Sequence, residues 1–252
     1  MTRYAPPSVH PCPGCNRLFL RRRFYSISTY GVAQVWSDGA PFALWRQEPL
    51  VRCDGCAALF WIADIEPVGI MPKRPQPIGR LTRAWTHWAG GRKGRLREEA
   101  EWSQAMECWG NAQSIGTINF DDVVYVLGRS KGVSRDRVLW LRNKIWWTLN
   151  NRYRREPDDT SVPDELRWPR SAERSNMEAL LDMLRDGEVR PQDMIQQGEL
   201  LRLLGRFDEA IAVLTAVPAD GHSEVQAVKI ERLARGGDTQ VRELRGASRG
   251  SR

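Results

Sequence analysis

Two Cys-x-x-Cys pairs near the N-terminus constrain the fold of this chain more than any other feature. The stretch HPCPGCNRLF holds Cys12 and Cys15, and the stretch VRCDGCAALF holds Cys53 and Cys56. In each pair a glycine stands before the second cysteine, where a tight turn benefits from the absence of a Cβ. Structural zinc is tetrahedral and is commonly held by four thiolates from two such turns. The spacing therefore predicts one zinc site built from all four cysteines.

Other uses of these cysteines fit the sequence less well. A redox-active dithiol is expected at a strand-to-helix junction within a βαβ unit, and neither pair lies in such a pattern. Disulfides would require export, and five cysteines are not the even set of a small secreted framework. His10 is a spare nitrogen ligand, but with four thiolates present we expect it beside the site or at the surface. Because protein fills all four positions, the Zn²⁺ is expected to be structural, although four thiolates also accept iron.

The composition predicts a globular protein of the cytoplasm. The 252 residues are 41% hydrophobic and include 11 Trp, enough for a sizeable core. No stretch has the run of about eighteen apolar residues that a membrane span needs, and the first residues lack the order of a secretory signal. We therefore expect a cytoplasmic protein without a membrane partner.

The order of these features predicts an α+β fold with a boundary after the second cysteine pair. A hairpin is expected to turn at Ser37, Asp38 and Gly39, between the two pairs. Four prolines between Pro67 and Pro77 block helix and sheet, so this stretch predicts a linker or surface strap. The predicted segments are a small antiparallel β zinc-ribbon module over 1–69, a basic Pro/Trp-containing linker over 70–97, a mainly α-helical module over 98–245 and a disordered tail over 246–252.

The strongest predicted helix lies in SRDRVLWLRNKIWWTLNNRYRR, over residues 136–155. Ser134 is placed to cap it, and apolar residues recur at spacings of three and four. Trp140 and Trp147 widen the apolar stripe, which predicts burial against more than one neighbour. Four further helical stretches follow a polar loop, and their short connections predict antiparallel packing.

The second and third of these four helical stretches resemble a tetratricopeptide repeat, a helix-turn-helix unit of about thirty-four residues. The best match covers residues 191–224. It rests on small residues at Gly198, Gly205 and Ala210 and on an aromatic residue at Phe207. The resemblance implies helical hairpins that present a surface to a protein or peptide; packing on the tryptophan-rich helix alone is the structural alternative.

The full order of features resembles a group of uncharacterised bacterial proteins. The shared elements are CPGC, VWSDG, CDGCAALFW, LRNKIWWTLNNRYR, GELLRLLGRFDEAI and ARGGD. These proteins join an N-terminal four-cysteine zinc ribbon to a tetratricopeptide-repeat-like helical C-terminal half. The resemblance implies the fold and the metal, and it implies no reaction.

The sequence spells out no catalytic arrangement. Its three histidines, His10, His87 and His222, are scattered, and GGRKGR lacks the order of a phosphate-binding loop. Cys108 lies in a tryptophan-rich helical stretch, where we expect it to be buried in packing. We therefore predict no enzyme activity and no small-molecule substrate.

The segment from 67 to 97 is the main binding candidate in the sequence. It has eight Lys/Arg and no acidic residue, and aromatic residues lie between the cations. Bases stack on aromatic rings while cations neutralise phosphates, so the segment predicts a nucleic-acid or acidic-partner site. Acidic residues that follow at 98–101 are alternative partners for the same cations. The candidate residues are Lys73, Arg74, Arg80, Arg83, Trp85, Trp88, Arg92, Lys93, Arg95 and Arg97.

Three functional hypotheses follow from the sequence. The leading one is a non-catalytic zinc-binding protein that acts as an adaptor or scaffold through a protein or peptide partner. The second is a nucleic-acid-binding protein that uses residues 67–97. The third is an immunity or antitoxin protein that binds and blocks a toxin.

Overall fold

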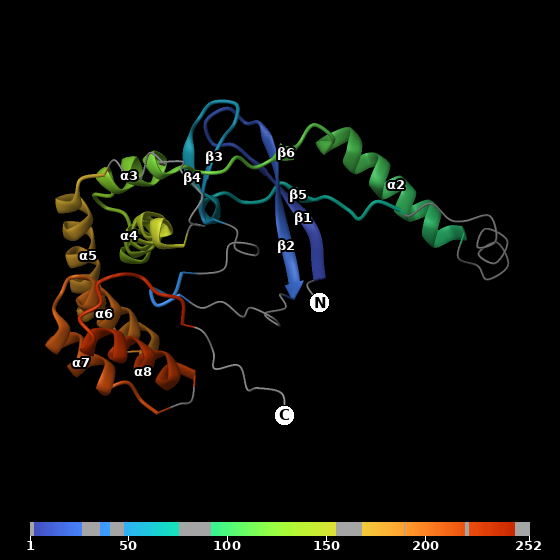
Figure 1. The fold of residues 1–252 in the computed structure, drawn as a ribbon. Helices are drawn as coiled ribbons and strands as arrows, with labels where there is room; N and C mark the ends of the chain where they lie inside the picture. The colour runs from blue at the N-terminus through green and yellow to red at the C-terminus, as the bar shows by residue number, and fades with distance from the viewer. Residues whose placement is uncertain are drawn as a thin grey trace, which may run out of the picture. The chain divides into compact units, whose positions relative to one another are not determined.

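The computed structural model describes residues 3–26, 36–40, 48–75, 92–154, 168–188, 190–219 and 222–244. The chain forms two compact units, residues 1–29 with 45–118 and residues 30–44 with 119–252. Among the described residues, the first unit holds the strands and one α-helix, and the second holds the other α-helices (Figure 1). This arrangement confirms the α+β class and the helical C-terminal half.

The first unit is built on a four-stranded sheet and a separate hairpin. The sheet strands are β1 (Arg3–Pro11), β2 (Leu18–Ser26), β5 (Gly69–Ile70) and β6 (Gln113–Ser114), in the order β5-β1-β2-β6. β1 runs antiparallel to β2 and β5, whereas β6 runs parallel to β2. The separate hairpin consists of β3 (Leu50–Arg52), β4 (Leu59–Trp61) and the short 3₁₀ helix Ile62–Asp64. Each Cys-x-x-Cys pair lies in the turn of one hairpin.

Helix α2 (Arg92–Trp109) belongs to the first unit rather than to the other helices. Its Trp102, Ala105 and Trp109 pack against Val9 of the sheet in one apolar cluster. A Cβ on Gly69 would lie 2.2 Å from the Trp109 ring, so only glycine permits this contact. The proline-containing stretch after residue 67 therefore includes an edge strand of the sheet, and the unit boundary differs from the predicted one.

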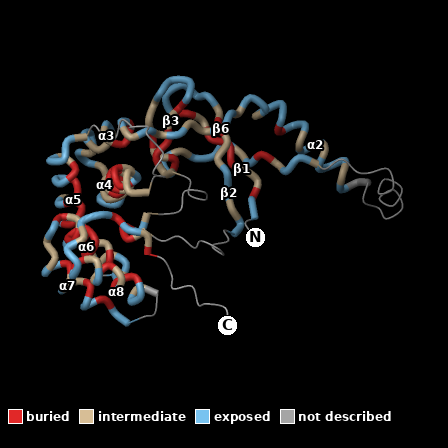
Figure 2. Tube along the Cα trace, viewed as in Figure 1, coloured by how far each residue is buried: buried red, intermediate tan, exposed pale blue. Residues whose placement is uncertain are grey.

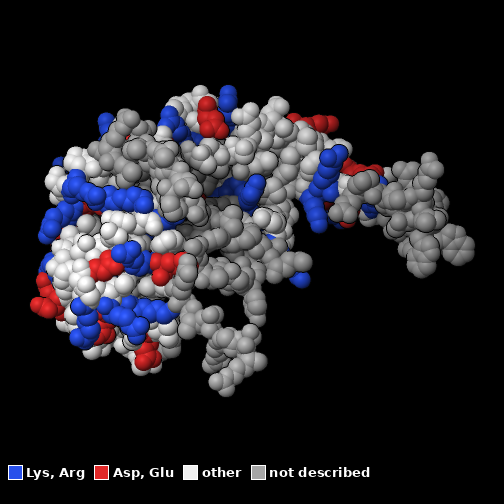
Figure 3. Space-filling model, viewed as in Figure 1, with Lys and Arg blue, Asp and Glu red and all other residues white. Residues whose placement is uncertain are grey.

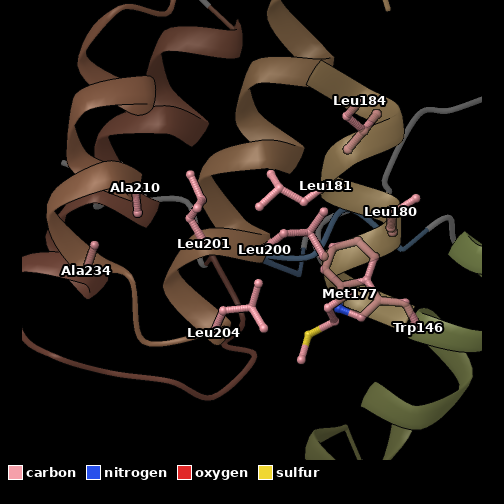
Figure 4. Close-up of a cluster of buried hydrophobic side chains, with 10 residues drawn as sticks. All are labelled: Trp146, Met177, Leu180, Leu181, Leu184, Leu200, Leu201, Leu204, Ala210 and Ala234. Carbon is pink, nitrogen blue, oxygen red and sulfur yellow. The ribbon is translucent and has the colours of Figure 1, made fainter. Parts of the chain in front are cut away.

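The second unit is a series of helices in which sequence neighbours pack together. The helices are α3 (Phe120–Gly128), α4 (Arg135–Asn150), α5 (Arg170–Arg185), α6 (Pro191–Leu203), α7 (Phe207–Thr215) and α8 (His222–Arg235), with a 3₁₀ turn at Asn151–Tyr153. Their main core joins Trp146 of α4 to leucines of α5 and α6 and to small residues of α7 and α8 (Figure 4). Figure 2 shows buried positions recurring along the inner sides of these helices.

Two helix starts show how local sequence sets the ends of these elements. Asn119 and Asp122 form a capping box, in which each side chain accepts a hydrogen bond from the other residue's backbone N–H. Ser134 stands at the N-cap of α4 as predicted, but its hydroxyl makes no capping hydrogen bond. α4 packs against α3 and α5, which confirms that its apolar stripe has more than one neighbour.

The short segment 36–40 lies in the second unit, although its neighbours in sequence are strands of the first. Ser37 and Asp38 form a turn as predicted, and Gly39 has a φ of 63°. Trp36, however, pairs as an isolated bridge with Glu243 near the end of the helical unit. The flanks of the predicted hairpin lie outside the described residues.

Some other predictions are wrong or fall outside this description. Cys108 is exposed on α2 rather than buried, because the residues of α2 that face the sheet are Trp102, Ala105 and Trp109. The polar loop after residue 155 and the tail over 246–252 lie outside the described residues. Among the described helices, none combines the length and the apolar character that crossing a membrane requires.

Candidate metal centre

The first Cys-x-x-Cys pair forms the turn between β1 and β2. The Cys12 N–H donates to the Arg17 carbonyl at 2.9 Å, and the Asn16 N–H donates to the Cys12 carbonyl at 2.9 Å. Asn16 has a φ of 58°, a left-handed conformation that asparagine tolerates better than most residues. The Gly14 N–H points at the Cys12 sulfur at 3.4 Å. This turn therefore aims backbone donors at a sulfur atom.

The second pair repeats this turn between β3 and β4. The Cys53 N–H donates to the Ala58 carbonyl at 2.9 Å, and the Ala57 N–H donates to the Cys53 carbonyl at 2.8 Å. Ala57 has a φ of 58°, as Asn16 does in the first turn. The Gly55 N–H lies 3.4 Å from the Cys53 sulfur. The two turns thus present their cysteines in the same local geometry.

The four sulfur atoms meet in one cluster. All lie within 4.8 Å of one another, with Cys12 Sγ 3.6 Å from Cys56 Sγ and Cys15 Sγ 3.7 Å from Cys53 Sγ. These distances exclude disulfides, whose sulfurs are about 2.05 Å apart. A tetrahedron with metal–sulfur bonds of about 2.3 Å has sulfur–sulfur edges of about 3.75 Å. The four cysteines are therefore positioned to bind a metal ion.

Backbone donors and burial set the protonation of these thiols. Burial opposes ionisation of Cys53, but the N–H groups of Cys56 and Gly55, together with the Cys12 and Cys15 thiols, outweigh it and lower the pKa of Cys53 to about 7. Burial raises the pKa of the Cys12 thiol. Four thiolates this close together repel one another, so a divalent cation is needed to hold all of them ionised.

His10 lies beside the cluster, but its ring is not one of the four metal-binding groups. Its ring is buried, stacks on Phe19 at 5.6 Å and bonds to the Ser8 hydroxyl at 2.9 Å and the Ile65 carbonyl at 3.1 Å. Burial lowers the pKa of His10. Both ring nitrogens therefore have protein partners, and His10 ties β1 to the end of the second hairpin.

A later segment, 113–116, completes the metal-binding unit and was missed from the sequence. Its strand β6 pairs with β2, and Gly116 forms a bridge to Arg52, next to Cys53. A Cβ on Gly116 would lie 2.2 Å from the Asp54 carboxylate and 2.7 Å from the Arg52 carbonyl. The small segment has only a two-residue strand, so no periodicity marks it in the sequence. It joins the two cysteine hairpins to each other.

The predicted basic site is only partly described. Lys73 and Arg74 are exposed beyond β5, whereas Arg95 and Arg97 form ion pairs with Glu99 and Glu101 along α2. Two of the ten predicted residues are thus engaged by the acidic stretch that follows them. Arg80, Arg83, Trp85 and Trp88 lie outside the described residues, and the side chains of Arg92 and Lys93 are not described.

The residues of the predicted repeat lie where α6 and α7 meet. A Cβ on Gly198 would lie 2.4 Å from the Leu214 side chain, so the glycine allows the two helices to approach closely. Gly205 has a φ of 78° in the turn between the helices, where glycine is unstrained. Ala210 is fully buried, and Phe207 packs on the same core. These positions explain why small residues recur here.

The helical unit also contains a buried polar network around segment 36–40. Arg202 bonds both oxygens of Glu199, at 2.7 and 2.8 Å, and both side chains are fully buried. Asp38, also buried, pairs with Arg154 and accepts a hydrogen bond from Asn150 at 2.8 Å. Burial raises the pKa of Glu199, and Arg202 opposes this shift.

The network gathers three of the stretches that carry the family resemblance. VWSDG supplies Ser37 and Asp38, and GELLRLLGRFDEAI supplies Glu199 and Arg202. ARGGD ends at Asp238, and Arg202 donates hydrogen bonds to the backbone carbonyls of Asp238 and Gln240. Its members bond one another, so the arrangement fits a structural role. Outside the four cysteines, the described residues contain no other cluster of three or more His, Cys, Asp or Glu ligand atoms.

Comparisons with protein-family models, curated proteins and solved structures give no match to this chain.

Proposed function

We propose that this chain is a non-catalytic zinc-binding protein of the bacterial cytoplasm that acts by recognising another protein. The observation that carries the proposal is the cluster of four cysteine sulfurs on two equivalent hairpin turns. Four thiolates in tetrahedral positions favour zinc, and they leave no coordination position for a substrate. The zinc would therefore stabilise a small β unit, as in a zinc ribbon, rather than perform chemistry.

The helical unit supports the recognition part of the proposal. Its helices pack as short hairpins, with Gly198 and Gly205 at the close approach and the turn that a tetratricopeptide repeat requires. Exposed apolar side chains remain on its last helix, where Val225 and Val228 lie one turn apart at 54% and 50% exposure. We propose that this apolar pair contributes to the surface that contacts the partner.

Metal content tests the first part of this proposal. The purified full chain is expected to hold one zinc per molecule, measured by elemental analysis, and substitution by Co²⁺ should give the visible spectrum of a four-thiolate site. A chain that folds with no bound metal, or that binds metal with open coordination and turns over a substrate, would contradict it.

Partner capture tests the second part. Tagged full chain is expected to retain a defined protein from a lysate treated with nuclease, and Val225→Asp with Val228→Asp should release it. The control is Val68→Asp, which changes a valine of similar exposure (51%) in the first unit. Retention that is lost equally in both variants, or only after nuclease treatment, would contradict recognition through the helices.

A further inference from the structure

The β1–β2 hairpin is the most one-sidedly charged part of the described chain. Residues 3–26 contain five arginines and no aspartate or glutamate. Arg3, Arg22 and Arg23 lie near the open end of the hairpin, which is the end away from the cysteine turn. A hairpin end that gathers several arginines attracts anions.

Many arginines elsewhere in the described structure pair with carboxylates, whereas Arg3 and Arg23 of the hairpin do not. Among the described residues, twelve arginines of α2 and the helical unit form ion pairs with carboxylates. Figure 3 shows blue and red atoms side by side over the helical unit. Arg3 and Arg23 make no such pair in the described part of the chain. Their charge is therefore available to a partner.

Aromatic rings lie at the same end of the hairpin. Tyr4 and Tyr25 are 55% and 73% exposed, and the Tyr4 ring contacts Phe24 with centroids 5.1 Å apart. The register pairs Arg3 with Ser26 and Tyr4 with Phe24, which leaves Tyr25 as the extra residue of a β-bulge. A bulge re-aims the side chain at its extra position. The strand geometry thus places exposed rings next in sequence to Arg3 and close in sequence to Arg23.

We propose that this open end of the β1–β2 hairpin binds single-stranded nucleic acid. Proteins that hold single strands combine cations that contact the phosphate backbone with aromatic rings on which bases stack. Arg3 and Arg23 supply the first component, and Tyr4 and Tyr25 supply the second. The surface is distinct from the proposed protein-recognition helices, so either function can fail without the other.

The chemistry favours a nucleic acid over other anions. An acidic peptide or an anionic lipid surface would use the arginines but does not offer the regular series of flat bases that can stack on two exposed tyrosines. The location also differs from the segment 67–97 expected from the sequence, where Arg95 and Arg97 already pair with carboxylates. Lys73 and Arg74, which follow β5 of the same sheet, also lack ion pairs in the described residues and extend the cationic surface.

Fluorescence anisotropy with labelled single-stranded oligonucleotides tests the proposal on the full, metal-loaded chain. Twenty-nucleotide poly-U and poly-dT probes are expected to bind more tightly than a duplex of the same length. Tyr25→Ala should weaken binding about tenfold, because each base–aromatic stack contributes on that scale. Arg23→Gln should weaken binding and reduce the salt dependence by about 0.7 in log–log slope, the value for one phosphate contact to a single strand.

The matched control is Arg97→Gln, which removes the same charge from an exposed arginine of the first unit and should leave affinity within about twofold. All variants need unchanged circular dichroism and metal content. An equal loss with Arg97→Gln and Arg23→Gln would overturn the proposal, because it would show attraction to net charge alone. So would binding of heparin or anionic vesicles at the same affinity with no effect of Tyr25→Ala, or no oligonucleotide binding at low salt.

Discussion

Asn150 donates a 2.8 Å hydrogen bond to Asp38, a residue 112 positions earlier in the chain. Asp38 lies between the two cysteine pairs in sequence, yet it is buried among the helices of the second unit. Its backbone carbonyl also accepts a hydrogen bond from the Trp147 indole at 3.1 Å, and Arg154 pairs with its carboxylate. One early turn of the chain is thus bound both by α4 and by Arg154, which follows the 3₁₀ turn after α4.

Replacing Asp38 should therefore destabilise the helical unit. Asp38→Ala leaves the half-buried Arg154 guanidinium without its carboxylate, and breaking a pair with a buried member costs up to about 3–5 kcal/mol. Urea unfolding followed by circular dichroism at 222 nm measures the loss. Glu178→Ala, which breaks an exposed pair with Arg174, should cost less than about 1 kcal/mol. Similar losses for the two variants would contradict the role assigned to Asp38.

Gly198→Ala tests the close approach of α6 and α7. Alanine normally stabilises a helix interior relative to glycine, but here its Cβ would lie 2.4 Å from Leu214. We expect a net destabilisation of about 1–3 kcal/mol from overpacking, measured by thermal and urea unfolding. Gly128→Ala in α3 is the control, because its Cβ meets nothing within 4 Å. An increase in stability for Gly198→Ala would show that the helices do not approach as described.

Gly116→Ala tests the segment that joins the two cysteine hairpins. Its Cβ would lie 2.2 Å from the Asp54 carboxylate, so the backbone bridge to Arg52 should shift. We expect faster loss of metal to a chelator and a destabilisation of about 1–3 kcal/mol. Gly94→Ala, in the same unit with nothing within 4 Å of its Cβ, should release metal at the wild-type rate. Equal rates of metal loss in the two variants would contradict the structural role assigned to residues 113–116.

Removing one cysteine sulfur should abolish stable metal binding. Cys12→Ser is expected to reduce bound metal well below one per chain and to loosen the first unit, because its two hairpins meet at the four sulfurs. Cys108→Ser changes an exposed cysteine outside the cluster and should keep the full metal content. Elemental analysis, with hydrogen exchange across β1–β4, measures both effects. Full metal content in Cys12→Ser, or an equal loss of metal in Cys108→Ser, would contradict this assignment.

Features set by local spacing were predicted well from the sequence. The cysteine pairs need only two tight turns, and the apolar periodicity of residues 135–150 marks α4 without knowledge of its neighbours. In each case the physical cause lies within one turn of helix or one hairpin, so the pattern is visible in a short window.

Features set by distant partners were missed. Segment 36–40 looks like a hairpin turn on its own, and only residues after 146 reveal that it belongs among helices. Residues 113–116 are too short to show a period, and their fit depends on the atoms of Arg52 and Asp54. Cys108 was expected to be buried because tryptophans surround it, but they occupy other sides of α2.

The division of the chain between the two units has a consequence for folding during synthesis. Residues 30–44 leave the ribosome early, but they belong to a unit whose other residues begin at 119. The first unit must likewise wait for Gly116, and the polar network around Ser37 must wait for Arg242, whose backbone N–H bonds the Ser37 hydroxyl at 3.0 Å. Neither unit can therefore be completed as the growing chain emerges, and neither can be isolated by a single cut. A fragment that starts at residue 119 would leave Arg154 without the carboxylate of Asp38.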